Sequence, residues 1–201
     1  MTKLELPRII LASQSPRRKA LLESIGLDFE VIVKHADENI PPDTPVEKIP
    51  ELIAHEKAMA VKKEVMRWAE RQTEDSIHYP ILAADTLVEL DGKMIGKPGN
   101  RNEAISMLQM LSGKTHRVIT GVVIYTPQKE ISFTDITLVT FYPLLQNQIE
   151  FYVDHYKPFD KAGAYGIQEW IGLVGIKSIE GDFYNVMGLP VSRVLQALYS
   201  L

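Results

Sequence analysis

The sequence predicts a mixed α/β fold, and three observations lead to this class. Short apolar segments rich in β-branched residues alternate with segments whose apolar residues recur at helical spacing. Two long β-rich stretches, residues 116–125 and 131–141, lie in the middle of the chain with a short connection between them. Glycine, proline and capping residues stand where these segments would begin and end. We therefore expect a mixed central sheet flanked by helices.

The first elements form a strand–turn–helix unit. Residues 8–12 (RIILA) predict a short buried strand, and residues 13–15 predict a turn. A helix is expected from Pro16, because serine before a helix and proline at its first position are strong start signals, and Gly26 ends it. A second strand is predicted at residues 29–33.

A long helix and a hairpin follow. Residues 49–70 carry apolar residues at helical spacing, and residues 81–90 predict a strand. The Asp-Gly turn at residues 91–92 leads into a short second strand at residues 93–95. Residues 100–111 predict a further helix that begins with a capping box.

The last third of the chain continues the alternation. The stretches 116–125 and 131–141 are expected to pair with each other, and residues 146–156 predict a helix. Residues 173–179 predict another strand, and the Gly-Leu-Pro sequence at 188–190 opens a C-terminal helix.

Composition narrows the classes of function. The chain has 201 residues, 45% hydrophobic and 24% charged, which is ordinary for one globular domain over residues 1–201. The net charge of -4 disfavours nucleic-acid binding. The absence of cysteine excludes disulfides, thiolate zinc sites and a cysteine nucleophile. No apolar run approaches about 18 residues, so we expect a cytoplasmic protein that does not enter a membrane.

The first candidate site is the turn before the first helix. A helix start offers unpaired N–H groups and the positive end of the helix dipole, both of which attract phosphate. Ser13 adds a hydroxyl, and Arg17 and Arg18 add planar guanidinium groups suited to phosphate or to a base carbonyl. Alone, the pattern is more often ordinary capping with solvated arginines. Two cations at a helix start are, however, better explained if an anion lies between them.

The second candidate site consists of carboxylates. Asp85 interrupts an apolar strand, where a buried acid needs a cap, a cationic partner or a metal ion. Asp37 and Glu38 lie in a loop after the second strand. A few carboxylate oxygens together with water and phosphate oxygens suit Mg²⁺. A turn-capping Asp85 and a solvated loop remain the alternatives.

Other candidates are weaker. Lys57 and Lys97 alone resemble surface lysines, and His116 is more typical of packing than of catalysis. The glycine-rich loop at residues 160–168 allows close approach to a ligand, and Gln168 offers both a donor and an acceptor, as reading a pyrimidine edge requires. A tight turn with a capping glutamine is the alternative interpretation.

Taken in order, these segments resemble the Maf family of nucleotide pyrophosphatases. The resemblance covers almost the whole chain, and the glycine-rich loop resembles the subfamily that acts on dTTP and UTP. The matching segments are ASQSPRR (12–18), ADE (36–38), AHEKA (54–58), AADT (83–86), GKP (96–98), LSGKTHRVITGV (111–122), DKAGAYGIQ (160–168) and GDFYNVMGLP (181–190).

The resemblance implies a curved mixed sheet with two lobes around a cleft, related to inosine triphosphate pyrophosphatases. It implies hydrolysis of dTTP, UTP or modified pyrimidine nucleotides to the monophosphate and pyrophosphate, a divalent cation (Mg²⁺ or Mn²⁺), and a homodimer. Asp85 matches the family's proton acceptor. The base-choice positions match Arg17, Thr86 and Gln168, and those for phosphate and metal match Ser13, Arg18, Glu38, Lys57 and Lys97.

The hypothesis that follows combines the residue patterns with the family resemblance. Glu38 and Asp85 would hold the cation, the cationic side chains would neutralise the triphosphate, and Asp85 would orient or deprotonate the attacking water. A Maf pyrophosphatase of the 7-methyl-GTP type and a non-catalytic nucleotide-binding regulator of cell division remain alternatives. The acidic positions favour catalysis, because a pure anion binder gains little from them.

Overall fold

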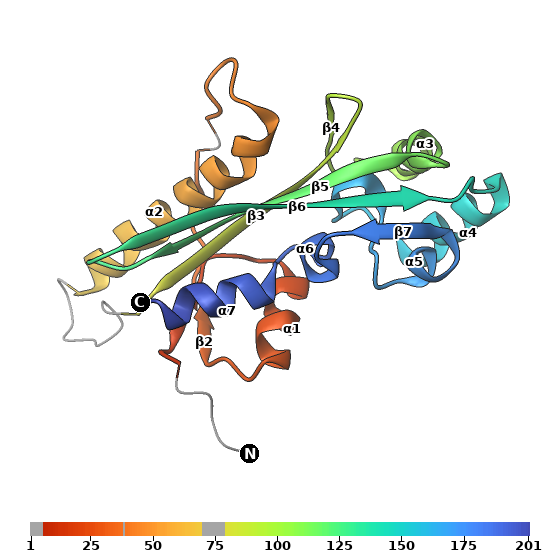
Figure 1. Cartoon of the computed structure of the whole chain (residues 1–201). Coiled ribbons are helices and arrows are strands. Elements are labelled where there is room, and N and C mark those ends of the chain that lie inside the picture. The colour runs from red at the N-terminus through yellow and green to blue at the C-terminus, as the bar shows by residue number, and fades with distance from the viewer. Residues whose placement is uncertain (1–5, 38, 70–78) are drawn as a thin grey trace. The chain divides into compact units, whose positions relative to one another are not determined.

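The computed structural model describes residues 6–37, 39–69 and 79–201 (Figure 1). These residues form two compact units, each built from separate stretches of the chain. The first unit comprises residues 1–85, 120–134 and 188–201, and the second comprises residues 86–119 and 135–187. No helix of the described residues combines the length and the apolar character that crossing a membrane requires.

The strands of the described residues form one seven-stranded sheet in the order β2-β1-β3-β5-β6-β7, with β4 paired to β3. β1 pairs in parallel with both β2 and β3, whereas the β3–β4 and β6–β7 pairs are antiparallel. The predicted mixed α/β class is therefore confirmed. The strands are β1 (Ile9–Leu11), β2 (Phe29–Val31), β3 (Ile81–Leu90), β4 (Lys93–Ile95), β5 (Thr115–Tyr125), β6 (Glu130–Phe141) and β7 (Ile176–Glu180).

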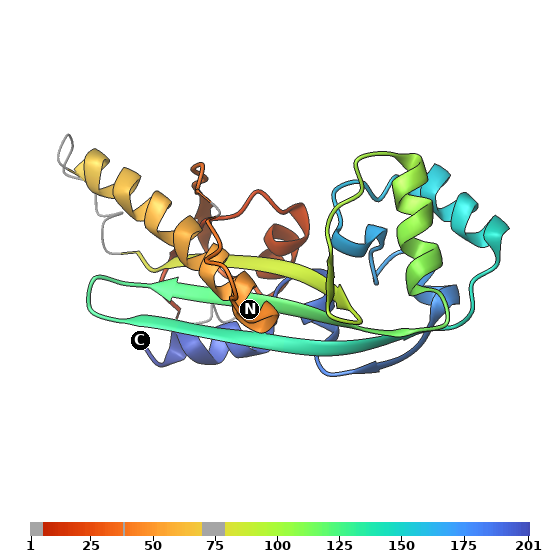
Figure 2. The ribbon, with the colours of Figure 1, turned by 90° about the horizontal axis from the view of Figure 1, so that it is seen from above.

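In the first unit, helices cover both faces of the sheet. α2 (Ile49–Ala69) lies on one face, and α1 (Pro16–Ser24) and α7 (Val191–Tyr199) lie on the other (Figures 1 and 2). A short 3₁₀ turn, η1 (Val46–Lys48), leads into α2. The buried residues of α2 recur at helical spacing, because about one side chain per turn faces the sheet. Four of its buried residues, Ala54, Ala58, Val61 and Val65, belong to one core cluster with Ile10, Ile81 and Val123.

The second unit has its own core. α3 (Arg101–Leu111) packs against α4 (Gln146–Tyr156) and against the 3₁₀ turn η3 (Ala162–Ala164). Two shorter helices, α5 (Trp170–Gly175) and α6 (Phe183–Met187), flank β7 in the chain. The large buried side chains of this core include Leu108, Leu111, Phe141, Tyr152 and Ile171.

One predicted element is wrong at its start. The strand expected at residues 173–179 begins only at β7, because residues 170–175 form α5. The apolar run resembles a strand, yet Ile171 is fully buried while Leu173 is 84% exposed. Gly172 makes the helix possible here, since an added Cβ would lie 1.8 Å from the carbonyl oxygen of Ile167. The other predicted elements agree with the structure to within about two residues at each end, and α6 was not predicted.

Candidate functional site

The turn between β1 and α1 is held by its own serines. Ser15 is the N-cap of α1, and its Oγ accepts a hydrogen bond from the Arg18 amide at 3.4 Å. The Oγ of Ser13 accepts one from the Ser15 amide at 3.2 Å. Pro16 occupies the start of the helix, as predicted. The shape of the turn is therefore held by hydrogen bonds within the chain, between serine side chains and backbone amides.

Arg18 is buried and connects three distant segments. Its Nε donates to the Gly188 carbonyl at 2.7 Å, and its Nη1 donates to the Ala84 carbonyl at 2.8 Å and to Ser13 Oγ at 3.0 Å. Burial lowers the pKa of Arg18 to about 10, the charge of Asp85 acts in the opposite direction, and Arg17 lowers the pKa further. The guanidinium therefore stays charged at neutral pH. The prediction that it binds phosphate stays a prediction.

Lys57 and Asp85 form an ion pair. The Nζ of Lys57, on α2, lies 2.6 Å from the Oδ1 of Asp85, on β3, and each side chain keeps about a quarter of its surface exposed. The residue before Asp85, Ala84, is the one whose carbonyl binds Arg18. The structure thus brings together four of the predicted residues, Ser13, Arg18, Lys57 and Asp85, around the end of β1 and the middle of β3. Arg17 is half-buried in the first turn of α1.

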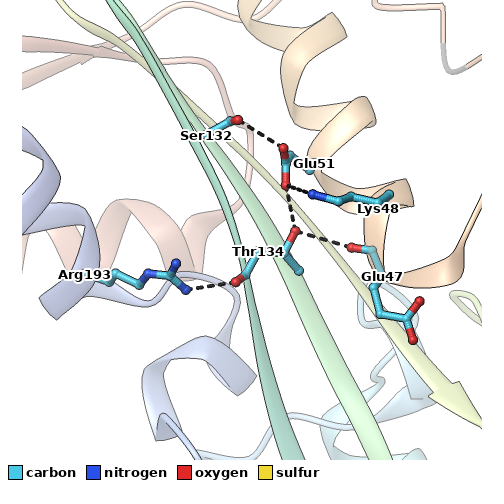
Figure 3. A network of polar contacts seen from close by, with 6 residues as sticks. All are labelled: Glu47, Lys48, Glu51, Ser132, Thr134 and Arg193. Carbon is cyan, nitrogen blue, oxygen red and sulfur yellow. Dashed lines mark hydrogen bonds and ion pairs between the residues drawn. The ribbon is translucent and has the colours of Figure 1, made fainter.

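The start of α2 is fixed against β6 by a group of polar contacts (Figure 3). The carboxylate of Glu51 accepts hydrogen bonds from Ser132 at 3.0 Å, from Thr134 at 2.9 Å and from Lys48 at 3.4 Å. Burial acts to raise the pKa of Glu51, but these bonds outweigh it, so that the pKa is lowered. On the other side of the strand, Arg193 donates to the Thr134 carbonyl at 2.8 Å.

Backbone packing adds to this fixation. Gly121 of β5 faces the start of α2, and an added Cβ would lie 2.1 Å from the Glu51 nitrogen and 2.3 Å from the Pro50 carbonyl carbon. Only glycine allows this approach of helix to strand. Sequence reasoning did not single out Gly121 or Glu51. A lone glycine within a β-branched strand is the signal that predicts such a close approach.

Of the remaining predicted residues, Thr86, Lys97 and Gln168 lie in the second unit. Asp37 is exposed in the first unit, and Glu38 lies outside the described residues. Thr86 is half-buried on β3, whereas Lys97 and Gln168 are exposed. The amide of Gly163 donates to the Gly96 carbonyl at 3.0 Å, so that the segment carrying Lys97 lies beside the glycine-rich loop.

Tyr165 of that loop and His116 of β5 serve packing. The Nε2 of His116 and the hydroxyl of Tyr165 lie 2.7 Å apart, and both side chains are buried against Phe141. Burial lowers the pKa of His116 to about 4, so that the ring is neutral at pH 7. His116 is therefore a core residue, as the sequence favoured, and Tyr165 offers no exposed face to a ligand.

The described side chains limit the kinds of metal site. Within residues 6–37, 39–69 and 79–201, no group of three or more His, Asp and Glu side chains could hold a metal ion. Mg²⁺ usually takes only one or two protein carboxylates and completes its shell with water and phosphate oxygens. Asp85 keeps part of its surface exposed beside Lys57 and fits such a ligand set. A closed structural metal centre does not fit these residues.

These features define the class of protein. A mixed α/β sheet carries a serine–arginine turn before a helix and, beside it, a lysine–aspartate pair on neighbouring elements. Such an arrangement is typical of enzymes and binding proteins that act on phosphorylated small molecules.

The sequence places the chain within this class. The family described as Maf-like protein matches residues 8–201, and the chain belongs to this family. A protein of Cytophaga hutchinsonii named dTTP/UTP pyrophosphatase is 50% identical over 190 residues, which cover 94% of this chain and 82% of that protein. A protein of Bacteroides thetaiotaomicron with the same name is 46% identical over 98% of both chains.

The fold has a solved counterpart. The Staphylococcus aureus Ham1 protein aligns with 96% of this chain and 98% of its own, with a TM-score of 0.50 and 15% identity. At this level of identity the likeness concerns the fold alone. It agrees with the mixed sheet flanked by helices that the sequence predicts.

Proposed function

We propose that this chain is a nucleoside triphosphate pyrophosphatase that hydrolyses dTTP and UTP to the monophosphate and pyrophosphate. One observation carries the proposal: relatives bearing that name are 50% and 46% identical over nearly the whole chain. Modified pyrimidine nucleotides share the same base edge and are expected to be substrates as well. We further propose that the enzyme acts in the cytoplasm as a homodimer.

Asp85 and Lys57 are the centre of the proposed chemistry. Hydrolysis between the α- and β-phosphates needs a water aligned with the α-phosphorus and neutralisation of the departing pyrophosphate. Asp85 orients this water and accepts its proton. Lys57 holds one oxygen of the Asp85 carboxylate at 2.6 Å, and this contact fixes the direction in which the other oxygen points.

The other residues bind and select the substrate. Ser13, Arg18 and Lys97, together with Lys57, bind the triphosphate, and the buried Arg18 also holds the β1–α1 turn in place. The base-reading residues are Arg17, Thr86 and Gln168. Gln168 can donate and accept hydrogen bonds at the same time, as a pyrimidine edge requires.

A divalent cation completes the proposal. Glu38 and Asp85 would hold Mg²⁺ or Mn²⁺ together with phosphate oxygens. When bound, the cation supplies charge neutralisation and lowers the pKa of a coordinated water.

The direct test is the release of pyrophosphate from dTTP, UTP, CTP, GTP and 7-methyl-GTP, with and without EDTA. We expect dTTP and UTP to be the best substrates and EDTA to abolish their hydrolysis. Release from 7-methyl-GTP alone would support the alternative Maf activity. Nucleotide binding without any release would support a regulator instead.

Asp85→Asn tests the catalytic assignment. Because the substitution removes a proton acceptor while keeping size and shape, kcat for UTP should fall by about 100-fold or more. Asp154→Asn is the matched control, since that exposed carboxylate pairs with Arg101 on the surface of the second unit. Near-wild-type turnover of Asp85→Asn, with both variants folded by circular dichroism, would refute the role of Asp85.

A further inference from the structure

The exposed Gln168 lies in a four-residue turn with fixed ends. The Glu169 amide donates to the Gly166 carbonyl at 3.0 Å, which closes a β-turn with Ile167 and Gln168 at its centre. Ile167 is buried, whereas Gln168 is exposed. The Gly172 amide at the start of α5 donates to the Glu169 carbonyl at 2.9 Å. The turn therefore presents one side chain to solvent and holds its neighbour in the core.

A single buried hydroxyl binds both ends of this turn. The Gly166 amide donates to the Tyr152 hydroxyl at 2.9 Å, and that hydroxyl donates to the Glu169 carboxylate. Tyr152 lies on α4 and is fully buried. Burial and the Glu169 carboxylate raise the pKa of Tyr152 well above its usual value of 10. The hydroxyl thus remains a donor at every pH at which the enzyme would work.

Lys161 adds a second support to the same carboxylate. Its Nζ lies 3.1 Å from Glu169 Oε1 and 2.7 Å from Asp160 Oδ1, and the residue is 7% exposed. We call Tyr152, Lys161 and Glu169 the Tyr152 network. An added Cβ on Gly166 would lie 2.8 Å from the Glu169 carboxylate carbon, so the turn and the network are packed closely together.

The surrounding loop needs such support. Residues 162–166 are two glycines, two alanines and one tyrosine, a composition that leaves the free backbone many conformations. An amide that must donate and accept at one base edge discriminates only if its position is held within a fraction of an ångström. A buried, fully hydrogen-bonded polar network provides this restraint because its loss would leave buried polar groups unpaired.

We propose that the Tyr152 network holds Gln168 in the orientation that reads the pyrimidine, and that it thereby determines base selectivity. The proposal rests on the proposed function and deepens it. Tyr152, Lys161 and Glu169 are positioning residues: they act through Gln168 and touch no reacting atom.

Tyr152→Phe is the sharpest perturbation, because it removes one hydroxyl and keeps the ring. We expect the ratio of kcat/KM for UTP to that for CTP to fall at least 10-fold, mainly through a higher KM for UTP, while kcat changes less than threefold. Tyr156→Phe is the matched control. Tyr156 lies one turn later on α4, stacks on Tyr152 and is 39% exposed, so the same chemical change there should leave the ratio as it is.

A double-mutant cycle separates positioning from stability. In a Gln168→Ala background, Tyr152→Phe should produce no further change in the UTP/CTP ratio, because the residue through which it acts is gone. A lower Tm with an unchanged ratio in the single variant would overturn the proposal, and so would additive effects in the double variant. If Tyr152→Phe does not fold, Glu169→Gln replaces it with the same expected loss of selectivity.

The wild-type panel keeps the two proposals distinct. A wild-type enzyme that prefers dTTP and UTP, combined with an unchanged ratio in Tyr152→Phe, overturns the positioning role alone. A wild-type enzyme that does not prefer dTTP and UTP to CTP and GTP overturns the proposed function and the positioning role together.

Discussion

Replacing Gly121 by alanine should displace Lys57 in the candidate site, although Gly121 is not itself one of the site residues. The new Cβ would lie 2.1 Å from the Glu51 nitrogen, whereas ordinary contacts begin at 3.4 Å, so that α2 and β5 must separate by about 1.3 Å. Overpacking of this kind costs about 1–3 kcal/mol of stability. The separation also pulls Glu51 away from Ser132 and Thr134, whose hydrogen bonds hold the start of the helix.

The displacement of α2 should also move Lys57. This residue follows Glu51 by about 9 Å along a rigid helix, at about 1.5 Å per residue. Its 2.6 Å contact with Asp85 would therefore lengthen or rotate. Because misplacement of a catalytic group by about 1 Å can cost about 100-fold in rate, we expect kcat for UTP to fall by about 10- to 100-fold.

The assay combines pyrophosphate release with urea unfolding of the same preparations. Val65→Ala serves as the control: it lies on the buried side of α2 beyond Lys57 and is 3% exposed, so it lowers stability by leaving a cavity without pushing the helix away. We expect Val65→Ala to be destabilised and to keep its kcat. If Gly121→Ala is destabilised by a similar amount and also keeps its kcat, the reasoning that links the helix start to Lys57 is wrong.

Two further predictions concern Arg18 and His116, two buried residues that can carry a charge. Arg18→Lys cannot reproduce the bonds to the Gly188 and Ala84 carbonyls, and the free energy of unfolding measured in urea should fall by about 2 kcal/mol or more; an unchanged midpoint would contradict this. For His116, burial lowers the folded-state pKa from 6.5 to about 4, so between these pH values the unfolded chain binds the proton and the folded chain does not. Stability should therefore fall with decreasing pH in this window, by up to about 1.4 kcal/mol per unit, and His116→Leu should reduce this slope in urea titrations at several pH values.

Local signals predicted the fold well. Ser15 and Asn100 were expected to cap helices, and both do so, with side-chain oxygens that accept from Arg18 and Glu103 amides. Capping depends on residues three positions apart, so sequence alone contains the information. The error at residues 173–175 has the opposite origin, because the close contact of Gly172 with Ile167 decides the conformation and no periodicity reports it. The expectation of one domain over residues 1–201 stays a prediction.

Contacts between residues that lie far apart in the sequence could not be predicted from local sequence patterns. Arg18 was predicted to face a phosphate, yet the structure shows it bound to carbonyls 66 and 170 positions away in the chain. The family resemblance assigned Lys57 and Asp85 to one site, but their ion pair was not predicted, since neither residue alone indicates the other. Tyr152 gave no signal at all, because a tyrosine on the buried face of a helix resembles any core aromatic residue.

The hydrogen bond between Arg18 and Gly188 has a consequence for biosynthesis. A ribosome delivers Arg18 early, but the carbonyl that receives its Nε is made 170 residues later. Until then the guanidinium has to remain hydrated, and the turn that bears it lacks one of its supports. The order of translation thus delays completion of the β1–α1 turn until the segment around Gly188 has emerged.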